Sequence, residues 1–261
     1  MWSYRHEGFT VHQLPALSDN YIYLLDIPGA SILAAIDPAE AAPVNQACKK
    51  LGRKPTHILN THHHWDHVGA NLELKERYGC AIAGARADAS RIPGIDILVT
   101  EGEPFIAGAD IHALAVPGHT SGHIAFLLDD ALFCGDTLFG AGCGRLFEGT
   151  PEQMWQSLGK FARLPGETRF YCAHEYTLNN LKFALHIDPD NADLQERSGR
   201  DTSSREKGEP TIPGTIAEEL ATNPFLRPLD DAFRRSYAQA HAIKDDPVTV
   251  FAHIRAAKDH W

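Results

Sequence analysis

Short apolar runs rich in Val, Ile, Leu, Phe and Tyr recur along the first half of the chain, and Gly, Pro, Asn or Asp separate them. Apolar runs of about four to eight residues between turn-forming residues are typical of β-strands. A final strand signal is the segment RFYCAHE, at residues 169–175. The pattern before it predicts strands at residues 9–15, 21–26, 31–37, 56–60, 95–100, 111–116, 123–128 and 131–136.

Apolar residues spaced three or four positions apart interleave with these runs and indicate amphipathic helices. Within the strand-rich part, the helical pattern covers residues 40–51, 67–78 and 151–163. Thr150 and Pro151 are typical of a helix N-terminus, because threonine caps a free amide and proline lacks one. Beyond residue 175 only helical patterns follow, near residues 178–187, 189–199, 213–221, 231–243 and 246–258.

The change of pattern near residue 175 predicts two domains. Residues 1–175 combine strands with interspersed helices, which favours an α/β layered catalytic domain. Residues 176–261 are expected to form a small helical C-terminal domain. Within this domain, the polar segment 198–214 is rich in Gly, Pro and Ser, so we expect a surface loop or a fraying helix there.

The net charge of the chain argues against a nucleic-acid-binding protein. The chain of 261 residues carries 34 acidic and 24 basic residues, a formal net charge of −10, whereas nucleic-acid binding requires a basic surface. The N-terminal segment has no apolar run of the kind found in signal peptides or transmembrane helices. We therefore expect a cytoplasmic monomer with a small-molecule substrate and without nucleic-acid or membrane partners.

The cysteines and the Gly-rich segment are weak candidates for a functional site. Five cysteines, an odd number without CxxC spacing, point to reduced thiols and argue against a thiolate zinc site. The segment GAGCG, at residues 140–144, does not open a helix after a strand as a dinucleotide loop does, so we expect a flexible loop near the site. Cys143 within it is expected to be a bystander.

The segment THHHWDH, at residues 61–67, lies between a predicted strand and a predicted helix. Loops at strand ends are common positions for active sites. In an extended chain, side chains two positions apart point the same way, so His62 and His64 can bind one metal ion. Asp66 and His67 lie beyond the bend and can reach a second ion about 3.5–4 Å from the first.

Two residues of this segment are assigned other roles. His63 alternates with its neighbours and points the opposite way, so we expect it to support the ligands or to pack within the loop. Trp65 is expected to pack beside the site rather than to contact a substrate.

Three further ligands are expected, each just after a predicted strand: His119 in PGHTSGH, Asp136 in CGDT and His174 in CAHEY. The expected sets are His62, His64 and His119 at one ion, Asp66, His67 and His174 at the other, and Asp136 between them. Nitrogen and carboxylate donors without thiolate fit zinc, and also iron or manganese. The sequence therefore predicts two divalent metal ions per chain, with zinc expected first.

The segments THHHWDHVGA, PGHTSGH and CGDT, followed by a later histidine in this order, resemble the metallo-β-lactamase superfamily. The resemblance implies an αββα sandwich with a dinuclear metal site. GCGRLFEGTPEQM, CAHEYTLNNLKFA, TNPFLR and DPVTVFAHIRAAKD are similar to glyoxalase II, the hydroxyacylglutathione hydrolases. This second resemblance runs almost from end to end.

The resemblance to glyoxalase II implies an activity: hydrolysis of S-D-lactoylglutathione and other 2-hydroxyacylglutathiones to D-lactate and glutathione, the second step of methylglyoxal detoxification. Asp66 and Asp136 are the implied catalytic carboxylates, which act together with a hydroxide that bridges the two metals. Coordination lowers the pKa of water from 15.7 to about 7. The thiol leaving group has a pKa near 8.5, so no strong general acid is needed.

The resemblance also implies that the helical domain, residues 176–261, binds substrate. The implied glutathione contacts are Arg145, Phe147, Tyr176 and Arg227. Relatives often carry Lys and Tyr where this chain has Arg145 and Phe147, so one substrate hydrogen bond is lost. After Arg227, two aspartates occupy positions 230 and 231, where many relatives place a lysine. We therefore expect weaker glutathione binding than in those relatives.

Other functions were weighed on the same residues. A persulfide dioxygenase of the same superfamily would need only a mononuclear iron at His62, His119 and Asp136, and the second ligand set argues against it. A secreted β-lactamase would need a signal peptide, and a nuclease would need a basic surface. A non-catalytic metal-binding module would have a closed site, whereas a bridging aspartate leaves coordination open for water.

Overall fold

The computed structural model describes residues 1–261, which form two compact units. Unit 1 consists of Met1–Ala115 and Gly122–Gly135, and unit 2 consists of Val116–Ser121 and Asp136–Trp261. The units therefore interleave along the chain. The division predicted between residues 175 and 176 stays a prediction.

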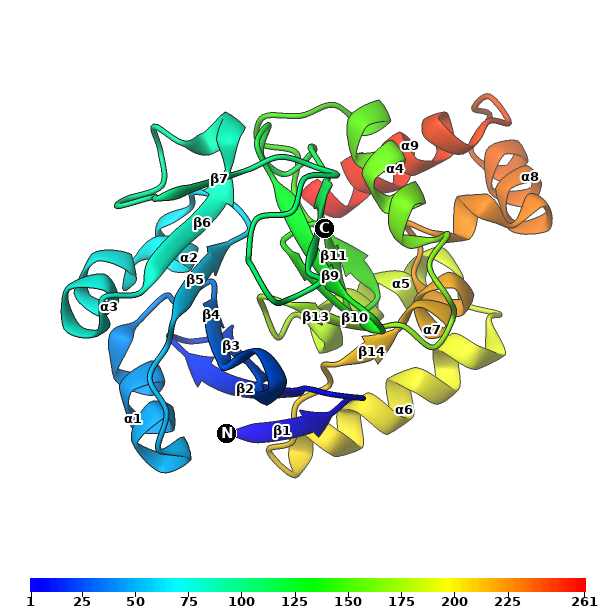
Figure 1. Ribbon diagram of the computed structural model, residues 1–261. Coiled ribbons are helices and arrows are strands. Elements are labelled where there is room, and N and C mark those ends of the chain that lie inside the picture. The colour runs from blue at the N-terminus through cyan, green and yellow to red at the C-terminus, as the bar shows by residue number, and fades with distance from the viewer. The chain divides into compact units, whose positions relative to one another are not determined.

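Unit 1 is built on a seven-stranded sheet with the strand order β1 to β7 (Figure 1). Neighbours from β1 to β4 run antiparallel, and those from β4 to β7 run parallel. The parallel half matters for the site, because carboxyl ends of parallel strands meet at one edge of a sheet. The strands are β1 (Trp2–Arg5), β2 (Thr10–Ala16), β3 (Asn20–Ile27), β4 (Ile32–Ile36), β5 (His57–Asn60), β6 (Ala81–Ala85) and β7 (Ile97–Val99).

Two helices of unit 1 cover one face of this sheet, α1 (Ala41–Leu51) and α3 (Asn71–Tyr78) (Figure 1). Val44 of α1 and Leu74 of α3 share one apolar cluster with Leu24 and Ile58, which alternate along their strands with residues of the other face. Each fully buried side chain of this kind contributes about 1.5–3 kcal/mol. The cluster thus fixes strands β3 and β5.

A second, antiparallel set of strands completes unit 1: β8 (His112–Ala115), β9 (Ile124–Leu128) and β10 (Ala131–Gly135). Tyr23 of β3 meets Phe133 of β10 edge to face, with ring centroids 5.8 Å apart. Strands of the two sets therefore pack face to face within this unit, as expected for a layered α/β protein.

Unit 2 is mainly helical. Its helices are α4 (Pro151–Phe161), α5 (Thr177–Ile187), α6 (Ala192–Glu206), α7 (Ile216–Thr222), α8 (Asp231–Ala240) and α9 (Pro247–Asp259). Its strands form two short antiparallel pairs, β11 (Leu138–Phe139) with β12 (Gly142–Cys143) and β13 (Arg169–Cys172) with β14 (Gly214–Thr215). Among all these helices and those of unit 1, none is both long and apolar enough to cross a membrane.

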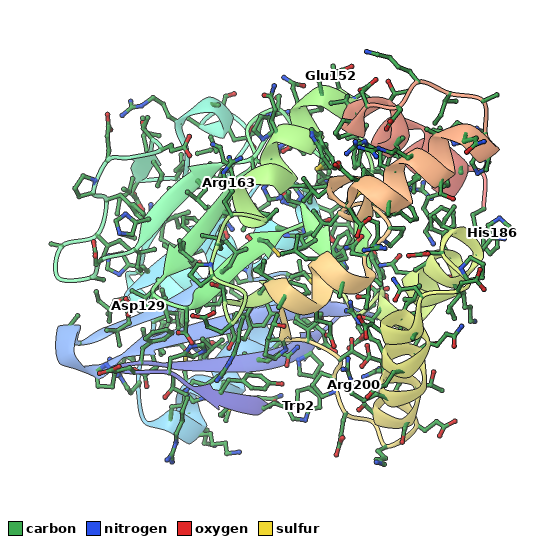
Figure 2. The ribbon with its side chains drawn as sticks, turned by 90° about the vertical axis from the view of Figure 1, so that its right-hand side faces the viewer. Trp2, Asp129, Glu152, Arg163, His186 and Arg200 are labelled. Atoms are coloured by element: carbon green, nitrogen blue, oxygen red, sulfur yellow. The ribbon has the colours of Figure 1, made fainter.

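The predicted start of α4 is confirmed. Thr150 accepts a hydrogen bond from the amide of Gln153, and the Gln153 side chain bonds back to the Thr150 amide. Figure 2 shows Glu152 and Arg163 at opposite ends of this helix. A negative charge at the first turn and a positive charge beyond the last both suit the helix dipole.

The sequence pattern missed strands β1 and β6, the two-residue strands β11, β12 and β14, and the break between α2 (Trp65–Val68) and α3. Strand β1 is short and polar, and β6 is rich in Ala and Gly, so neither shows a strong strand signal. The helix predicted at 67–78 is interrupted, because the amide of Ala70 bonds to the carbonyl of Pro38 at 2.9 Å. Gly69 allows this approach, since a Cβ there would lie 2.5 Å from the carbonyl oxygen of Ala39.

One expectation about loops holds only in part, and another was wrong. The first half of the segment 198–214 is not a loop but the helical alternative, because α6 continues to Glu206, and residues 209–213 contain neither helix nor strand. Figure 2 shows Arg200 on this helix. The segment 140–144 is not a flexible loop either: its residues are buried, and it contains the turn and second strand of the β11–β12 hairpin.

Candidate metal centre

The histidine segment of unit 1 leaves β5 and enters the short helix α2 (Trp65–Val68). The His62 ring centroid lies 4.6 Å from that of His64 and 4.0 Å from that of His67. One ligand atom of His62 lies within 4.8 Å of one on each of these histidines, and the same holds for Asp66 and His67. The structure therefore gathers the four predicted ligands of this segment.

Asp37 fixes this loop from the end of β4. Its carboxylate accepts hydrogen bonds from the Thr61 amide at 2.8 Å, the Thr61 hydroxyl at 2.7 Å and Nδ1 of His67 at 3.0 Å. A proton on Nδ1 leaves Nε2 of His67 as the lone-pair nitrogen, the form that binds a metal. Sequence analysis missed Asp37, although its position after a buried strand was a signal.

Two asparagines hold the other end of the segment. Asn20 donates from Nδ2 at 3.1 Å to the carboxylate oxygen of Asp66 that also lies 3.6 Å from Nε2 of His67, so this asparagine fixes the orientation of the Asp66 carboxylate. Asn60 donates to the carbonyl of His67 at 2.9 Å. Neither asparagine was predicted, because a single asparagine at a strand end is common and carries no distinctive pattern.

The spacer residues behave differently from each other. His63 points to Asp88, with 3.0 Å between Nδ1 and the carboxylate, which agrees with packing within the loop, one of the two roles expected for it. Trp65 does not pack as expected, because 71% of its surface is exposed. His123, which was not singled out, is buried and stacks on His62 with ring centroids 4.7 Å apart.

Unit 2 supplies the second group of predicted ligands. One carboxylate oxygen of Asp136 lies 3.4 Å from Nε2 of His119, and the other lies 3.5 Å from Nε2 of His174. All three side chains are buried. A carboxylate that offers one oxygen toward each of two histidines has the geometry required to bridge two cations.

The loop that follows β12 orients His119. Nδ1 of His119 lies 2.9 Å from the carbonyl oxygen of Arg145, so it donates there and leaves Nε2 for a cation. Gly144 permits this packing, because a Cβ would lie 2.0 Å from the carbonyl oxygen of Asp136. Glycine is therefore required at this position.

The donor sets suit a divalent metal. Imidazole nitrogens and carboxylate oxygens are the donors, and no thiolate is among them, which fits zinc, iron or manganese. In each unit a proposed ligand has its Nδ1 atom engaged in a hydrogen bond, His67 in unit 1 and His119 in unit 2. Nε2 is therefore the nitrogen that each of them would offer to a metal ion. The residues present therefore fit the metal ions that the sequence implies.

The implied substrate residues lie beside the ligands of unit 2. Phe147 is 63% exposed and meets the His119 ring with centroids 5.2 Å apart. Tyr176 stacks on His174 at 4.7 Å, with the rings nearly parallel. Arg145 has an exposed side chain.

Arg227 is differently placed from the other implied substrate residues. Its guanidinium pairs with Asp188 at 3.1 Å and with Asp230 at 3.5 Å, and it lies 5.2 Å from the centroid of the Phe233 ring. The chain's own carboxylates therefore compete for this arginine. Its role as a glutathione ligand stays a prediction.

The cysteines are free and buried. Burial raises the pKa of the Cys143 thiol to about 11, so this thiol is protonated at neutral pH and is a poor nucleophile. The bystander role expected for Cys143 is consistent with this.

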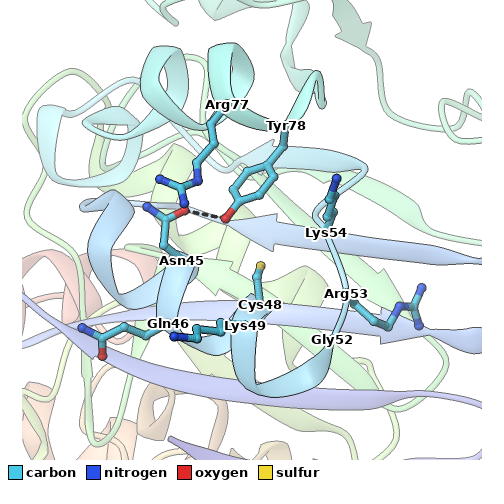
Figure 3. Close-up of a pocket in the computed structure, with 9 residues that line it drawn as sticks. All are labelled: Asn45, Gln46, Cys48, Lys49, Gly52, Arg53, Lys54, Arg77 and Tyr78. Carbon is cyan, nitrogen blue, oxygen red and sulfur yellow. Dashed lines mark hydrogen bonds between the residues drawn. The ribbon is translucent and has the colours of Figure 1, made fainter.

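A separate cavity of about 460 Å³ lies where α1 and α3 end (Figure 3). Its cationic residues are Lys49, Arg53, Lys54 and Arg77. Figure 3 shows the side chains of Arg53 and Lys54 pointing away from the hydrogen bond between Tyr78 and Asn45. Arg53 also pairs with Asp26. No histidine lines this cavity, so it is unrelated to the proposed ligands.

Comparison with protein families matches both parts of the chain. The family described as "Metallo-beta-lactamase superfamily" matches residues 20–174. The family described as "Hydroxyacylglutathione hydrolase C-terminus" matches residues 175–261.

Comparison with individual proteins gives the same result. A hydroxyacylglutathione hydrolase of Methylococcus capsulatus is 54% identical over 95% of this chain and 96% of its own length. One from Synechococcus sp. is 52% identical over 95% and 98%. Among solved structures, ETHE1 from Myxococcus xanthus has a TM-score of 0.67 at 26% identity, covering 95% of this chain and 91% of its own. TTHA1623, in a di-iron-bound form, has a TM-score of 0.54 at 28% identity, covering 63% and 91%.

Proposed function

The chain belongs to the hydroxyacylglutathione hydrolases of the metallo-β-lactamase superfamily, and we propose from this premise that it hydrolyses glutathione thioesters at a centre of two divalent metal ions. Family membership confirms the predicted fold class, an αββα sandwich followed by a helical C-terminal domain. It also confirms the predicted enzyme class, a metal-dependent hydrolase of hydroxyacylglutathiones.

The proposed centre joins the ligands of both units. His62, His64 and His119 would hold one ion, Asp66, His67 and His174 the other, and Asp136 would bridge them. The single observation that carries the proposal is the carboxylate of Asp136, whose two oxygens face Nε2 of two different histidines. Zinc is the proposed metal, with iron or manganese as alternatives for the same donors.

The chain's own residues divide the remaining work. When bound, a pair of divalent ions supplies Lewis acidity and a water whose pKa falls to about 7. Asn20 holds the carboxylate of Asp66 by a hydrogen bond, and the carboxylate of Asp136 lies beside His119 and His174. These contacts keep both carboxylates in the orientation of metal ligands. The leaving group is a thiol with a pKa near 8.5, so it can depart as the thiolate without protonation by a strong general acid.

Substrate recognition is proposed to depend on the loop after β12 and the start of α5. Arg145 is exposed and can hold a glutathione carboxylate through two charge-assisted hydrogen bonds. Phe147 and Tyr176 flank metal ligands and can position the thioester between them. Arg227 is included as a third contact, subject to competition from Asp188 and Asp230. S-D-lactoylglutathione is the proposed substrate.

Two finer proposals concern the protein as a whole. We place it in the cytoplasm, because its five cysteines are free thiols, as is usual in a reducing compartment. We also propose that it acts as a monomer, since the proposed ligands all come from one chain.

A mononuclear iron dioxygenase is not favoured. Such an enzyme would leave Asp66, His67 and Asp37 without a function, although these residues form a connected group. The relatives that share about half of their residues with this chain are hydroxyacylglutathione hydrolases.

The proposal is tested by incubating the purified protein with S-D-lactoylglutathione and following the loss of thioester absorbance. Hydrolysis that stops on adding a chelator and returns with zinc is the expected result. Oxygen consumption with glutathione persulfide, without thioester loss, would refute the proposal and favour the dioxygenase.

A further inference from the structure

The β11–β12 hairpin of unit 2 connects a proposed metal ligand with a proposed substrate contact. Asp136 lies just before β11, and Arg145 lies just after β12. The carbonyl of Arg145 orients His119, so the hairpin connects a bridging ligand to a ligand support and to a substrate contact. A shift of this hairpin would therefore move several reactive groups together.

Side chains of the helical region hold the hairpin on its backbone atoms. Asn223 donates to the carbonyl of Gly142 at 2.9 Å, and Asn180 of α5 donates to the carbonyl of Gly140 at 3.1 Å. Arg255 of α9 donates to the carbonyl of Cys143 at 2.9 Å. These donors come from three separate segments, which can be located around β11 in Figure 1.

The turn of the hairpin has a further, carboxylate partner. Oε2 of Glu219, on α7, accepts hydrogen bonds from the amide of Ala141 at 3.0 Å and from Nδ2 of Asn223 at 2.7 Å. Oε1 of the same side chain accepts from Arg197 at 2.6 Å. All three groups that contact the carboxylate of Glu219 are hydrogen-bond donors, so its ionised form, which only accepts, suits these partners.

Ala141 is where this support is needed most. Its φ of 51° lies in the left-handed region, which a residue with a Cβ adopts only when its surroundings enforce it. Its side chain is fully buried in a cluster with Leu181 and Leu194. Without Glu219, the buried amide of Ala141 would lose its acceptor.

From this geometry we propose that Glu219, held by Arg197, is a positioning residue for thioester hydrolysis: it fixes the β11–β12 hairpin and through it Asp136 and Arg145. The proposal rests on the proposed function, because it assigns a role in that reaction. It also gives the helical region a part in catalytic geometry besides binding substrate.

The variant Glu219→Gln tests the proposal, because glutamine keeps the size but replaces one acceptor oxygen with a donor. Whichever way the amide turns, one donor now faces Arg197 or the amide of Ala141. Glu218→Gln is the matched control, because Glu218 pairs with Arg200 at 2.6 Å and with Arg197 at 3.6 Å in the same charged group but has no hydrogen bond to the hairpin. Both proteins are assayed well below their melting temperatures.

For Glu219→Gln we expect kcat to fall by about 10- to 100-fold, the range seen when a support of reactive groups is lost. Amide hydrogen exchange in residues 138–143 should also accelerate, and zinc should bind more weakly. Glu218→Gln should change none of these. Equal kinetic constants for the two variants, or unchanged exchange in the hairpin, would overturn the proposal.

Two further experiments test the proposal if the variant does not fold or if the wild-type protein is inactive toward this substrate. If Glu219→Gln does not fold, Glu219→Asp keeps the charge but withdraws the carboxylate from the amide of Ala141, and a fall in kcat with faster hairpin exchange is expected. Unchanged kcat in that folded variant would overturn the proposal. If the wild-type protein does not hydrolyse S-D-lactoylglutathione, the proposed function fails, and zinc affinity and hairpin exchange still decide whether Glu219 positions the site.

Discussion

The carboxylate of Asp37 accepts a hydrogen bond from Nδ1 of His67 at 3.0 Å, and both side chains are buried. The same carboxylate accepts two hydrogen bonds from Thr61, the residue that precedes the first proposed ligand. One side chain thus fixes both the tautomer of His67 and the start of the histidine segment.

Replacing Asp37 by Asn should weaken metal binding. Asparagine has one acceptor oxygen in place of two, so its NH2 group faces either the amide of Thr61 or the donors of Thr61 and His67, and the group that fixes the tautomer of His67 is weakened. We expect zinc affinity or kcat to fall by about 10- to 100-fold, measured by chelator competition and thioester hydrolysis. Asp88→Asn is the control, because Asp88 pairs with the spacer His63, and it should leave zinc affinity unchanged. Equal losses in the two variants would contradict the role assigned to Asp37.

Replacing Phe147 by Tyr should strengthen substrate binding. The variant adds a hydroxyl to an exposed ring beside His119, the group that the resemblance to glyoxalase II led us to expect there. One hydrogen bond contributes about 0.5–1.5 kcal/mol, so KM should fall by about 2- to 10-fold, with kcat unchanged. Steady-state kinetics with S-D-lactoylglutathione provide the measurement. A KM equal to that of the wild type would show that the hydroxyl makes no substrate contact.

Replacing Asp230 by Asn should reduce the competition for Arg227, which then keeps its pair with Asp188 at 3.1 Å. The carboxylate lies 3.5 Å from the guanidinium, and asparagine removes its charge while still capping α8. If Arg227 holds a glutathione carboxylate, KM should fall by about 2- to 5-fold, and the effect should shrink in high salt. No change in KM at low ionic strength would remove Arg227 from the substrate site.

Lys258 should make stability depend on alkaline pH. Burial lowers its pKa to about 8, and the charges of Arg255 and Arg145 add to the shift. The unfolded chain keeps this proton up to about pH 10.4, so between about pH 8 and 10.4 the unfolded state binds more protons and stability rises with pH. The free energy of unfolding of the wild type should therefore increase relative to that of Lys258→Gln across this window. Urea denaturation at several pH values measures it, and a flat or falling difference would contradict the shift.

The proposed metal ligands could be named from the sequence because their signal is local. Four of the proposed ligands lie within six consecutive residues: His62, His64, Asp66 and His67. In an extended chain neighbouring side chains point to opposite sides, which distinguishes His63 from the histidines on either side of it. Each of the remaining ligands follows a strand, a position that by itself suggests a site.

The supports of the site were not predictable in the same way. Asp37, Asn20 and Glu219 are single polar residues at strand ends or in a helix, and they matter only through partners distant in sequence. The break between α2 and α3 likewise depends on a carbonyl of Pro38, far from the helical pattern. The exposure of Trp65 also depends on tertiary packing that no local pattern contains.

The most direct test of the central claim is a metal titration. Protein freed of metal is given zinc in known equivalents, and hydrolysis of S-D-lactoylglutathione is measured at each step. The account predicts that activity rises until two equivalents per chain are bound, and that His67→Ala retains one equivalent with most activity lost. Full activity at one equivalent, or near-normal turnover by His67→Ala, would contradict it.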